Sequence, residues 1–150
     1  MEPVNISLGE LDIRMGVEVV SESVERVEVR MPVERNRQSL GSLHGGAMAC
    51  LGEMAGSWAA LKYASTLGKA CVGVDINATH HRGLRSGYVR AVATPIKLGR
   101  TLTSHEVVIT AEETGERLCT VRITNALVES LGDLDAALEA ARADAIVDRV

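Results

Sequence analysis

The segment from Leu43 to Leu61, LHGGAMACLGEMAGSWAAL, constrains the fold of this chain more strongly than any other. Its residues are almost all small or apolar and include no proline, which predicts an α-helix packed closely against other elements. Gly68, in the TLGK that follows, is a typical helix terminator. A helix of about 20 residues is roughly 30 Å long and can cross a small domain.

The segments on either side of this helix alternate apolar and polar residues, which is typical of β-strands. Pro95 indicates a bulge or a sheet edge, and ETGE, which contains Gly115, predicts a hairpin turn. In one segment the alternation places Val72, Val74 and Ile76 on the same side. A single helix lying on a curled antiparallel sheet satisfies this order, so we predict an α+β fold. The predicted strands are 16–31, 70–78, 88–98, 101–112 and 117–128.

The length of the chain, 150 residues, is sufficient for one domain with a substantial core, and we expect residues 1–150 to form a single domain. Residues 1–15 are expected to be an N-terminal lead-in. Residues 131–150 are expected to contain a C-terminal amphipathic helix, because Leu134 and Leu138 share one apolar stripe.

The charge distribution and the cysteines exclude several classes of function. The net charge is −4 with acidic and basic residues interspersed, which does not favour a nucleic-acid partner. No segment resembles a signal peptide or approaches the ~20 apolar residues of a membrane span, so we expect a cytoplasmic protein without a membrane partner. Cys50, Cys71 and Cys119 are far apart and lack metal-ligand spacing, so we expect neither a metal site nor a disulfide.

Glu53 is an isolated carboxylate in the predicted helix. Lys62, near the helix end, suits the helix dipole and can reach solvent, but Glu53 has no such outlet. A solvated helix face is the commonest place for a glutamate, yet such a face should carry more polar residues than Ser57 alone. We therefore predict that Glu53 is shielded, that its pKa is raised, and that it acts as general base or nucleophile. Its neighbours at helical spacing are Ala49, Cys50, Gly56 and Ser57.

The start of the helix supplies a second candidate group. Gly45 and Gly46 place unpaired backbone N–H groups where a ligand can approach closely, and the helix dipole favours negative charge there. Such donors stabilise the oxyanion that develops on a thioester carbonyl. Glu53 lies about 12 Å further along the helix axis, so its side chain must reach back toward a carbonyl bound between the two groups.

Three further polar residues are candidates for this site, each with an alternative role. His44 and Gln38 can orient a substrate or water, or they can be turn residues that bond the backbone. Ser57, one turn after Glu53, can hold a water or bond back to the helix. The sequence contains neither a G-x-S-x-G motif nor a glycine-rich phosphate loop.

Three motifs resemble those of the hotdog-fold acyl-CoA thioesterases. They are RQSLGSLHGGAMACLGEMAGSWA, VGVDINATHHR and GYVRAVATPIKLGRT, and the resemblance runs from about Gly16 to Val128. The chain is most similar to the branch that contains 4-hydroxybenzoyl-CoA, 1,4-dihydroxy-2-naphthoyl-CoA and enterobactin-pathway proofreading thioesterases. The resemblance implies a long central helix wrapped by a curved antiparallel sheet. It also implies a homo-oligomer, a dimer or a homotetramer of paired dimers, with active sites at the dimer interface.

The resemblance further implies a role for individual residues. Glu53 matches the catalytic nucleophile or general base, and Gly45 matches the residue whose N–H polarises the thioester carbonyl. His44 and Gln38 match groups that position the thioester, and Ser57 matches a hydroxyl-bearing residue near the attacked carbon. The position of His81 commonly holds an apolar residue in the family. The residues that match the CoA-binding segments are Gly73, His80, His81, Arg82, Lys97, Leu98, Gly99, Arg100 and Thr101.

The function predicted from these features is hydrolysis of an aryl- or other compact acyl-CoA to free acid and CoA. No cofactor is expected, because coenzyme A is part of the substrate. Two alternatives remain: a catalytically silent acyl-CoA-binding protein, and a hotdog enoyl-CoA hydratase or dehydratase, which would need an Asp/His pair. Judged without the resemblance, the cations of the CoA segments are interpreted as solvated strand ends in preference to a phosphate site.

Overall fold

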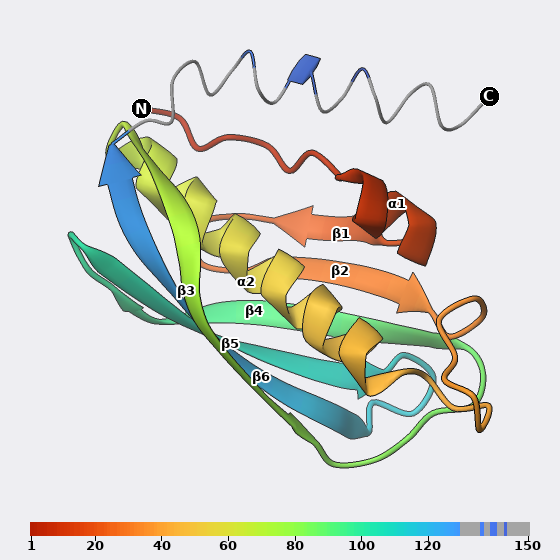
Figure 1. Cartoon of the computed structure of the whole chain (residues 1–150). Coiled ribbons are helices and arrows are strands. Elements are labelled where there is room, and N and C mark those ends of the chain that lie inside the picture. Colours follow the sequence, from red (N-terminus) through yellow and green to blue (C-terminus); the bar gives the residue numbers. More distant parts are fainter. Residues whose placement is uncertain (130–135, 137–138, 141–142, 144–150) are drawn as a thin grey trace.

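A long helix, α2 (Gly45–Thr66), lies across the concave face of a curved six-stranded antiparallel sheet (Figure 1). The computed structural model describes residues 1–129, 136, 139–140 and 143. A short helix, α1 (Glu10–Met15), precedes the sheet. The predicted α+β fold is confirmed. The strands are β1 (Glu18–Glu22), β2 (Val27–Pro32), β3 (Lys69–His80), β4 (Tyr88–Leu98), β5 (Leu102–Ala111) and β6 (Arg117–Glu129).

The sheet has β1 and β3 at its two edges, because its strand order is β1-β2-β4-β5-β6-β3. The region 16–31 folds as the β1–β2 hairpin, whose turn is closed by the N–H of Ser23 and the carbonyl of Arg26. The register shifts between Pro95 and Lys97, which confirms the bulge expected at the proline. Gly115 has a φ of +72° in the turn between β5 and β6.

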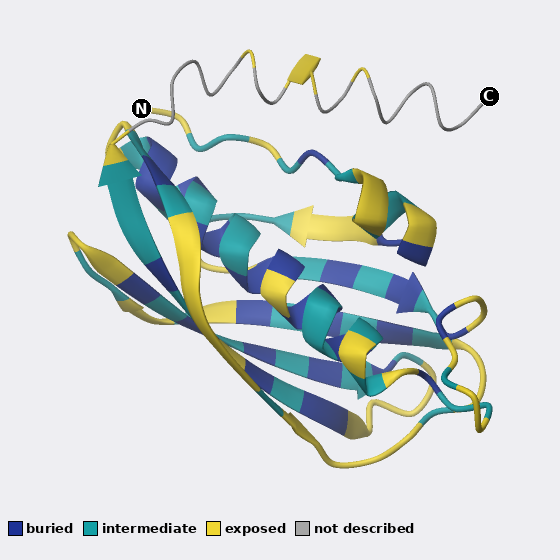
Figure 2. Cartoon of the chain, viewed as in Figure 1, coloured by how far each residue is buried: buried dark blue, intermediate teal, exposed yellow. Residues whose placement is uncertain are grey.

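Glycines let α2 approach the sheet closely. A Cβ atom on Gly52 would lie 2.5 Å from Cγ2 of Val121, and one on Gly56 would collide with Ile123. Neither position tolerates a side chain without movement of β6. Figure 2 shows the result, with buried residues on the side of α2 that meets the sheet and at alternate positions along the central strands.

The prediction that Lys62 reaches solvent is wrong. Its side chain is buried on α2, and its Nζ lies 2.6 Å from Oε1 of Glu22 and donates to the carbonyl of Val4 at 2.6 Å. The N-terminal segment and β1 cover this part of the helix, and nothing in the local sequence around Lys62 indicates that they do.

A β-bulge changes the faces predicted for β3. Gly73 pairs with Asn125 and Asp75 pairs with Thr124 of β6, so Val74 is an extra residue. Beyond the bulge the alternation is reversed, and Ile76 pairs with buried Ile123. The prediction of a single face for Val72, Val74 and Ile76 is therefore wrong.

The two ends of the chain complete the description. Helix α1 occupies part of the predicted lead-in 1–15 and was not anticipated, because it has six residues. Its ends are marked by Asp12, whose carboxylate accepts from the N–H of Gly9 at 2.8 Å, and by Gly16 in the left-handed conformation.

The helix predicted within 131–150 falls almost wholly outside the described residues. None of the described helices is long and apolar enough to cross a membrane.

Candidate active site

The first turn of α2 carries an available backbone donor. His44 is the N-cap residue, and its Nδ1 accepts a hydrogen bond from the N–H of Gly46 at 2.9 Å. Because Nδ1 accepts, the ring proton lies on Nε2, which can donate to a ligand. None of the described residues accepts from the N–H of Gly45. Each of the two groups is a donor of the type that can bind a carbonyl oxygen.

His80, at the end of β3, lies against this turn. A Cβ atom on Gly45 would be 3.0 Å from Nε2 of His80, closer than side chains normally pack. Glycine at this position therefore lets the imidazole and the helix backbone approach each other. The structure brings together Gly45, His44 and His80, which the sequence assigned to two separate parts of the substrate.

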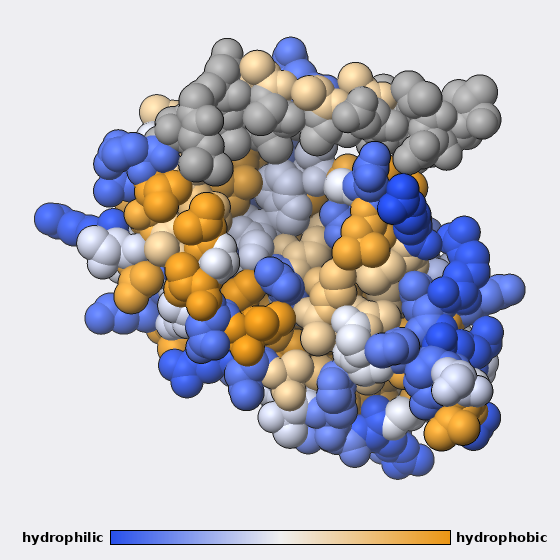
Figure 3. All heavy atoms as spheres, in the orientation of Figure 1, coloured by the Kyte–Doolittle hydropathy of each residue, from blue (hydrophilic) through white to orange (hydrophobic). Residues whose placement is uncertain are grey.

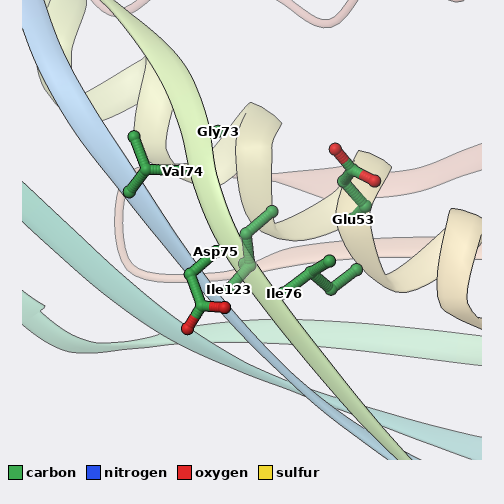
Figure 4. Close-up of a pocket in the computed structure, with 6 residues that line it drawn as sticks. All are labelled: Glu53, Gly73, Val74, Asp75, Ile76 and Ile123. Carbon is green, nitrogen blue, oxygen red and sulfur yellow. The ribbon is translucent and has the colours of Figure 1, made fainter.

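Glu53 lies two turns further along α2, at a cavity between the helix and β3 (Figure 4). Its Oε1 is 3.7 Å from the position that a Cβ on Gly73 would occupy. Glu53 is exposed, so the prediction of a shielded carboxylate is wrong for the single chain. The carboxylate is exposed because β3, the edge strand beside it, covers only one of its sides. The cavity has a volume of about 300 Å³ and is lined by Glu53, Gly73, Val74, Asp75, Ile76 and Ile123.

The bulge in β3 helps to shape this cavity. In Figure 4, Glu53 and Ile76 lie on one side of the β3 ribbon, and Val74 lies on the other. Without the extra residue, Ile76 would leave the helix face and the cavity would lose this apolar wall.

Ser57 has a buried partner that the sequence did not reveal. The side-chain Nδ2 of Asn125, on β6, donates to Oγ of Ser57 at 3.3 Å. Asn125 is fully buried and pairs across the sheet with Gly73 and Thr103. The available signal was an asparagine within a predicted strand, where this residue is uncommon.

Gln38 lies in the loop before α2 and is engaged in its own turn. Its Oε1 accepts from the N–H of Leu40, and its backbone N–H donates to the carbonyl of Ser42. These bonds fit the alternative in which Gln38 is a turn residue, and they leave its Nε2 as the group for any ligand.

Glu53 and Gly45 do not converge within one chain. Eight residues separate them on a straight helix, which corresponds to about 12 Å. The Glu53 carboxylate turns toward Gly73 on β3, whereas Gly45 lies beside His80 at the far end of that strand. Residues 73 and 80 are roughly 20 Å apart along an extended strand. The expected reach of Glu53 back toward the helix start is therefore not observed.

The predicted CoA-binding residues are likewise divided between two ends of the sheet. His81 and Arg82 follow β3, where the His81 Nε2 bonds to Thr120 and the Arg82 guanidinium pairs with Glu116 at 2.6 Å. The β4–β5 turn lies at the opposite end of the sheet, and Leu98 is half-buried at its start. A cavity of about 470 Å³ there is lined by Lys97, Gly99, Arg100, Thr101, Leu102, Thr103, Ser104, Arg122 and Thr124. Arg122, from β6, adds a cation that the sequence motifs did not indicate.

The thiols near the site are held protonated. Burial raises the pKa of Cys50, and the negative charges of Asp12 and Glu53 raise it further. Burial raises the pKa of Cys71 to about 11. A thiolate nucleophile is therefore disfavoured at neutral pH. In the described part of the chain, no three His, Cys, Asp or Glu side chains are grouped as metal ligands.

A long helix wrapped by a curved antiparallel sheet defines a hotdog-fold protein. Comparison with known proteins gives the family. The model of the thioesterase superfamily matches residues 40–118, and the chain belongs to that superfamily.

Individual relatives agree with this assignment. The proofreading thioesterase EntH of Cronobacter turicensis is 41% identical over 124 residues, covering 81% of this chain and 88% of the relative. The putative esterase PA1618 of Pseudomonas aeruginosa is 39% identical, covering 84% and 85%. The crystal structure of thioesterase HI1161 from Haemophilus influenzae superposes with a TM-score of 0.73 at 38% identity, covering 83% of this chain and 86% of that one.

Proposed function

We propose that this protein hydrolyses an acyl-CoA thioester to a carboxylic acid and free CoA. The observation that carries the proposal is the pairing of two features on α2: the unengaged N–H of Gly45 and the carboxylate of Glu53 at a cavity. The thioester carbonyl would accept from the N–H of Gly45 and from Nε2 of His44. These donors would stabilise the oxyanion as charge develops on it.

Glu53 would act on the polarised carbonyl by one of two routes. As general base, it takes a proton from a water whose oxygen attacks the acyl carbon; the carbon–sulfur bond then breaks and the sulfur is protonated. As nucleophile, it attacks the carbon itself, releases CoA, and forms a mixed anhydride that water cleaves. Both routes consume one water and yield the acid and the thiol.

The site would be completed by a second copy of the chain. β3 is an edge strand of 12 residues, and among the described residues only β6 pairs with it, so its outer edge can pair with another strand. Val72, Val74 and Ile76 are 39%, 57% and 40% exposed, and Figure 3 shows apolar residues gathered near this edge. Antiparallel pairing of β3 with its copy would reverse one chain relative to the other. The Gly45–His80 end of one subunit would then lie near the Glu53 end of the other.

The same arrangement would unite the two halves of the CoA site. The basic turn Lys97–Thr101 of one subunit would approach His80, His81 and Arg82 of its partner, giving the phosphates cations from both chains. An aryl or other compact acyl group is the substrate class we propose. A homotetramer of paired dimers is the proposed assembly, which light scattering of the purified protein tests. The cytoplasm is its proposed location.

Release of CoA from a panel of aryl, short-chain and long-chain acyl-CoAs tests the function. We expect turnover to be highest with aryl or compact groups and to fall by orders of magnitude in Glu53→Gln, with CoA binding retained. Near-normal turnover in Glu53→Gln would contradict the assignment of Glu53 as the catalytic carboxylate. Hydration of crotonyl-CoA, or tight binding without release of CoA, would favour the hydratase and silent-binder alternatives.

A single turnover in isotopically labelled water separates the two routes. Direct attack by water places the label in the product acid in that turnover. Unlabelled acid would rule out direct attack and would leave the anhydride route, in which water attacked the Glu53 carboxyl carbon.

A further inference from the structure

Ser57 and Asn125 form a polar pair next to the candidate catalytic carboxylate. Ser57 follows Glu53 by four residues, so the hydroxyl and the carboxylate lie on the same face of α2. Asn125 approaches from the sheet below, and its Nδ2 donates to Oγ of Ser57 at 3.3 Å. Asn125 has no exposed surface, so this contact is fixed by the packing of α2 on β6.

The direction of this hydrogen bond determines where the hydroxyl proton points. An amide Nδ2 donates and does not accept, so Oγ of Ser57 is the acceptor and its own proton must be directed elsewhere. None of the described residues accepts that proton. Ser65 and Thr66, later in the same helix, differ because their hydroxyls donate to backbone carbonyls at 2.8 and 2.6 Å. Ser57 therefore keeps a donor available for a ligand.

Gly73 leaves a space between this pair and Glu53. Gly73 is the cross-strand partner of Asn125, and a Cβ atom on it would lie 3.7 Å from Oε1 of Glu53 and 3.8 Å from Nδ2 of Asn125. These are ordinary contact distances, so a methyl group would fill this position without a clash. With glycine the position is open, and it belongs to the cavity at Glu53.

Asn125 is also incompletely satisfied by the fold. Its Oδ1 is buried and has no hydrogen-bond partner among the described residues. A buried polar group of this kind costs free energy, and native structures retain few of them without a reason. An asparagine in the interior of a strand adds no packing advantage over an apolar residue.

We propose that Asn125 is a positioning residue that directs the Ser57 hydroxyl toward a water molecule held at Gly73, within reach of Glu53. The inference rests on the proposed function. The role belongs to the general-base route, because a Glu53 carboxyl that is part of a mixed anhydride cannot take a proton. The water oxygen accepts from Ser57, one water proton points to Glu53, and the remaining lone pair faces the acyl carbon. Glu53 takes that proton as the new carbon–oxygen bond forms, and the proton then passes to the departing CoA sulfur.

A double-mutant cycle tests the proposal with steady-state kinetics. Asn125→Leu removes the donor at similar volume, and Ser57→Ala removes the hydroxyl. Each change is expected to lower kcat roughly tenfold, the size of one lost hydrogen bond, with KM little altered. Because Asn125 acts through Ser57, the double variant should be no slower than either single variant. Losses that multiply in the double variant would overturn the proposal.

His105→Leu is the matched control. His105 lies on β5, next to β6, is fully buried, and has ring nitrogens without a partner among the described residues. Its replacement removes a buried polar group at the same depth but not the donor to Ser57. We expect kcat to remain at the wild-type value. A loss equal to that of Asn125→Leu would mean that any polar change at this depth impairs the enzyme, and the proposal would fail.

Asn125→Val guards against a variant that does not fold. It removes the donor with an apolar side chain that favours strands. We expect lower kcat with KM little altered, in protein whose thermal unfolding remains cooperative. Wild-type kcat in this variant would contradict the inference. Glu53→Gln in the same assay separates the two claims: if it is inactive while the Asn125 variants are normal, only the positioning role is lost.

Discussion

Nζ of Lys62 lies 2.6 Å from Oε1 of Glu22, and Lys62 is only 2% exposed. The pair joins α2 to β1 at the edge of the sheet. The lysine also donates to the carbonyl of Val4, and a Glu22 oxygen accepts from the N–H of Ile6 at 3.1 Å. One ion pair therefore holds the N-terminal segment, β1 and the second half of α2 together.

Glu22→Gln should destabilise the protein because it leaves the buried ammonium of Lys62 without a counter-charge. Removing one partner of a buried pair typically costs about 3 kcal/mol or more, and we expect a loss of this order in the free energy of unfolding. Chemical denaturation measures it. Glu10→Gln, in the exposed Glu10–Arg14 pair at 3.7 Å, is the control and should cost less than about 1 kcal/mol. Equal losses in the two variants would contradict the buried role of Glu22.

Periodicity made most of this fold predictable, and distant contacts account for what was missed. The helix and the strands follow from spacing within the segment, and Gly68 and Gly115 mark turns that require a positive φ. Lys62 was misjudged because Glu22, its partner, is forty residues earlier. The bulge at Val74 depends on the register of β3 with β6, which no local pattern encodes.

The candidate site was predictable in its residues but not in its arrangement. The motifs identified Glu53, Gly45 and His44, because a lone carboxylate and a glycine-rich helix start have recognisable chemistry. The role of Asn125 depends on two strands meeting beneath α2. The separation of Glu53 from Gly45 depends on the position of the carboxylate beside Gly73, which the spacing along α2 does not encode.

His105 should make stability fall in acid. It is fully buried on β5, neither ring nitrogen has a partner among the described residues, and burial lowers its pKa to about 4 from 6.5. The unfolded chain therefore binds the proton first as pH falls. The contribution of neutral His105 is complete above pH ~6.5 and is lost progressively toward pH ~4.

Replacement of His105 by leucine isolates this effect. The variant removes the titrating group and does not lose this contribution in acid. As pH falls from 7 to 4, its free energy of unfolding minus that of wild type should therefore increase by roughly 3 kcal/mol. Urea denaturation at a series of pH values measures the difference. A difference that is constant with pH would show that His105 titrates normally in the folded protein.

Gly45→Ala should lower kcat by displacing the helix start from His80. The new methyl group would lie 3.0 Å from Nε2 of His80, so the ring or the backbone must move by a few tenths of an ångström. Because an oxyanion donor must be accurately placed, we expect a loss of roughly tenfold or more. The double variant Gly45→Ala, His80→Ala removes the crowding. Because His80 is also a candidate CoA contact, the two variants are compared at saturating substrate. If the double variant has no higher kcat than Gly45→Ala alone, steric displacement is not the cause.

A charge on the β3 edge should prevent assembly and activity together. Val74→Lys places an ammonium at the most exposed apolar position of this strand, where it would oppose pairing with a second copy. We expect a monomer by light scattering and loss of CoA release. Val20→Lys, on the opposite edge strand β1, is the control and should remain assembled and active. An active monomeric Val74→Lys would contradict a site shared between subunits.

Mixing two impaired variants provides a direct test of which chain supplies each group. If Glu53 of one subunit acts with Gly45 of the other, a hybrid of Glu53→Gln and Gly45→Ala subunits contains one intact site and one doubly altered site. Random exchange in an equal mixture makes half of the dimers hybrids, so activity should recover to about a quarter of the wild-type value. If each site lay within one chain, every site in the mixture would carry one lesion, and activity would stay at the average of the two separate variants. Co-refolding the two variants and measuring CoA release therefore distinguishes the two arrangements.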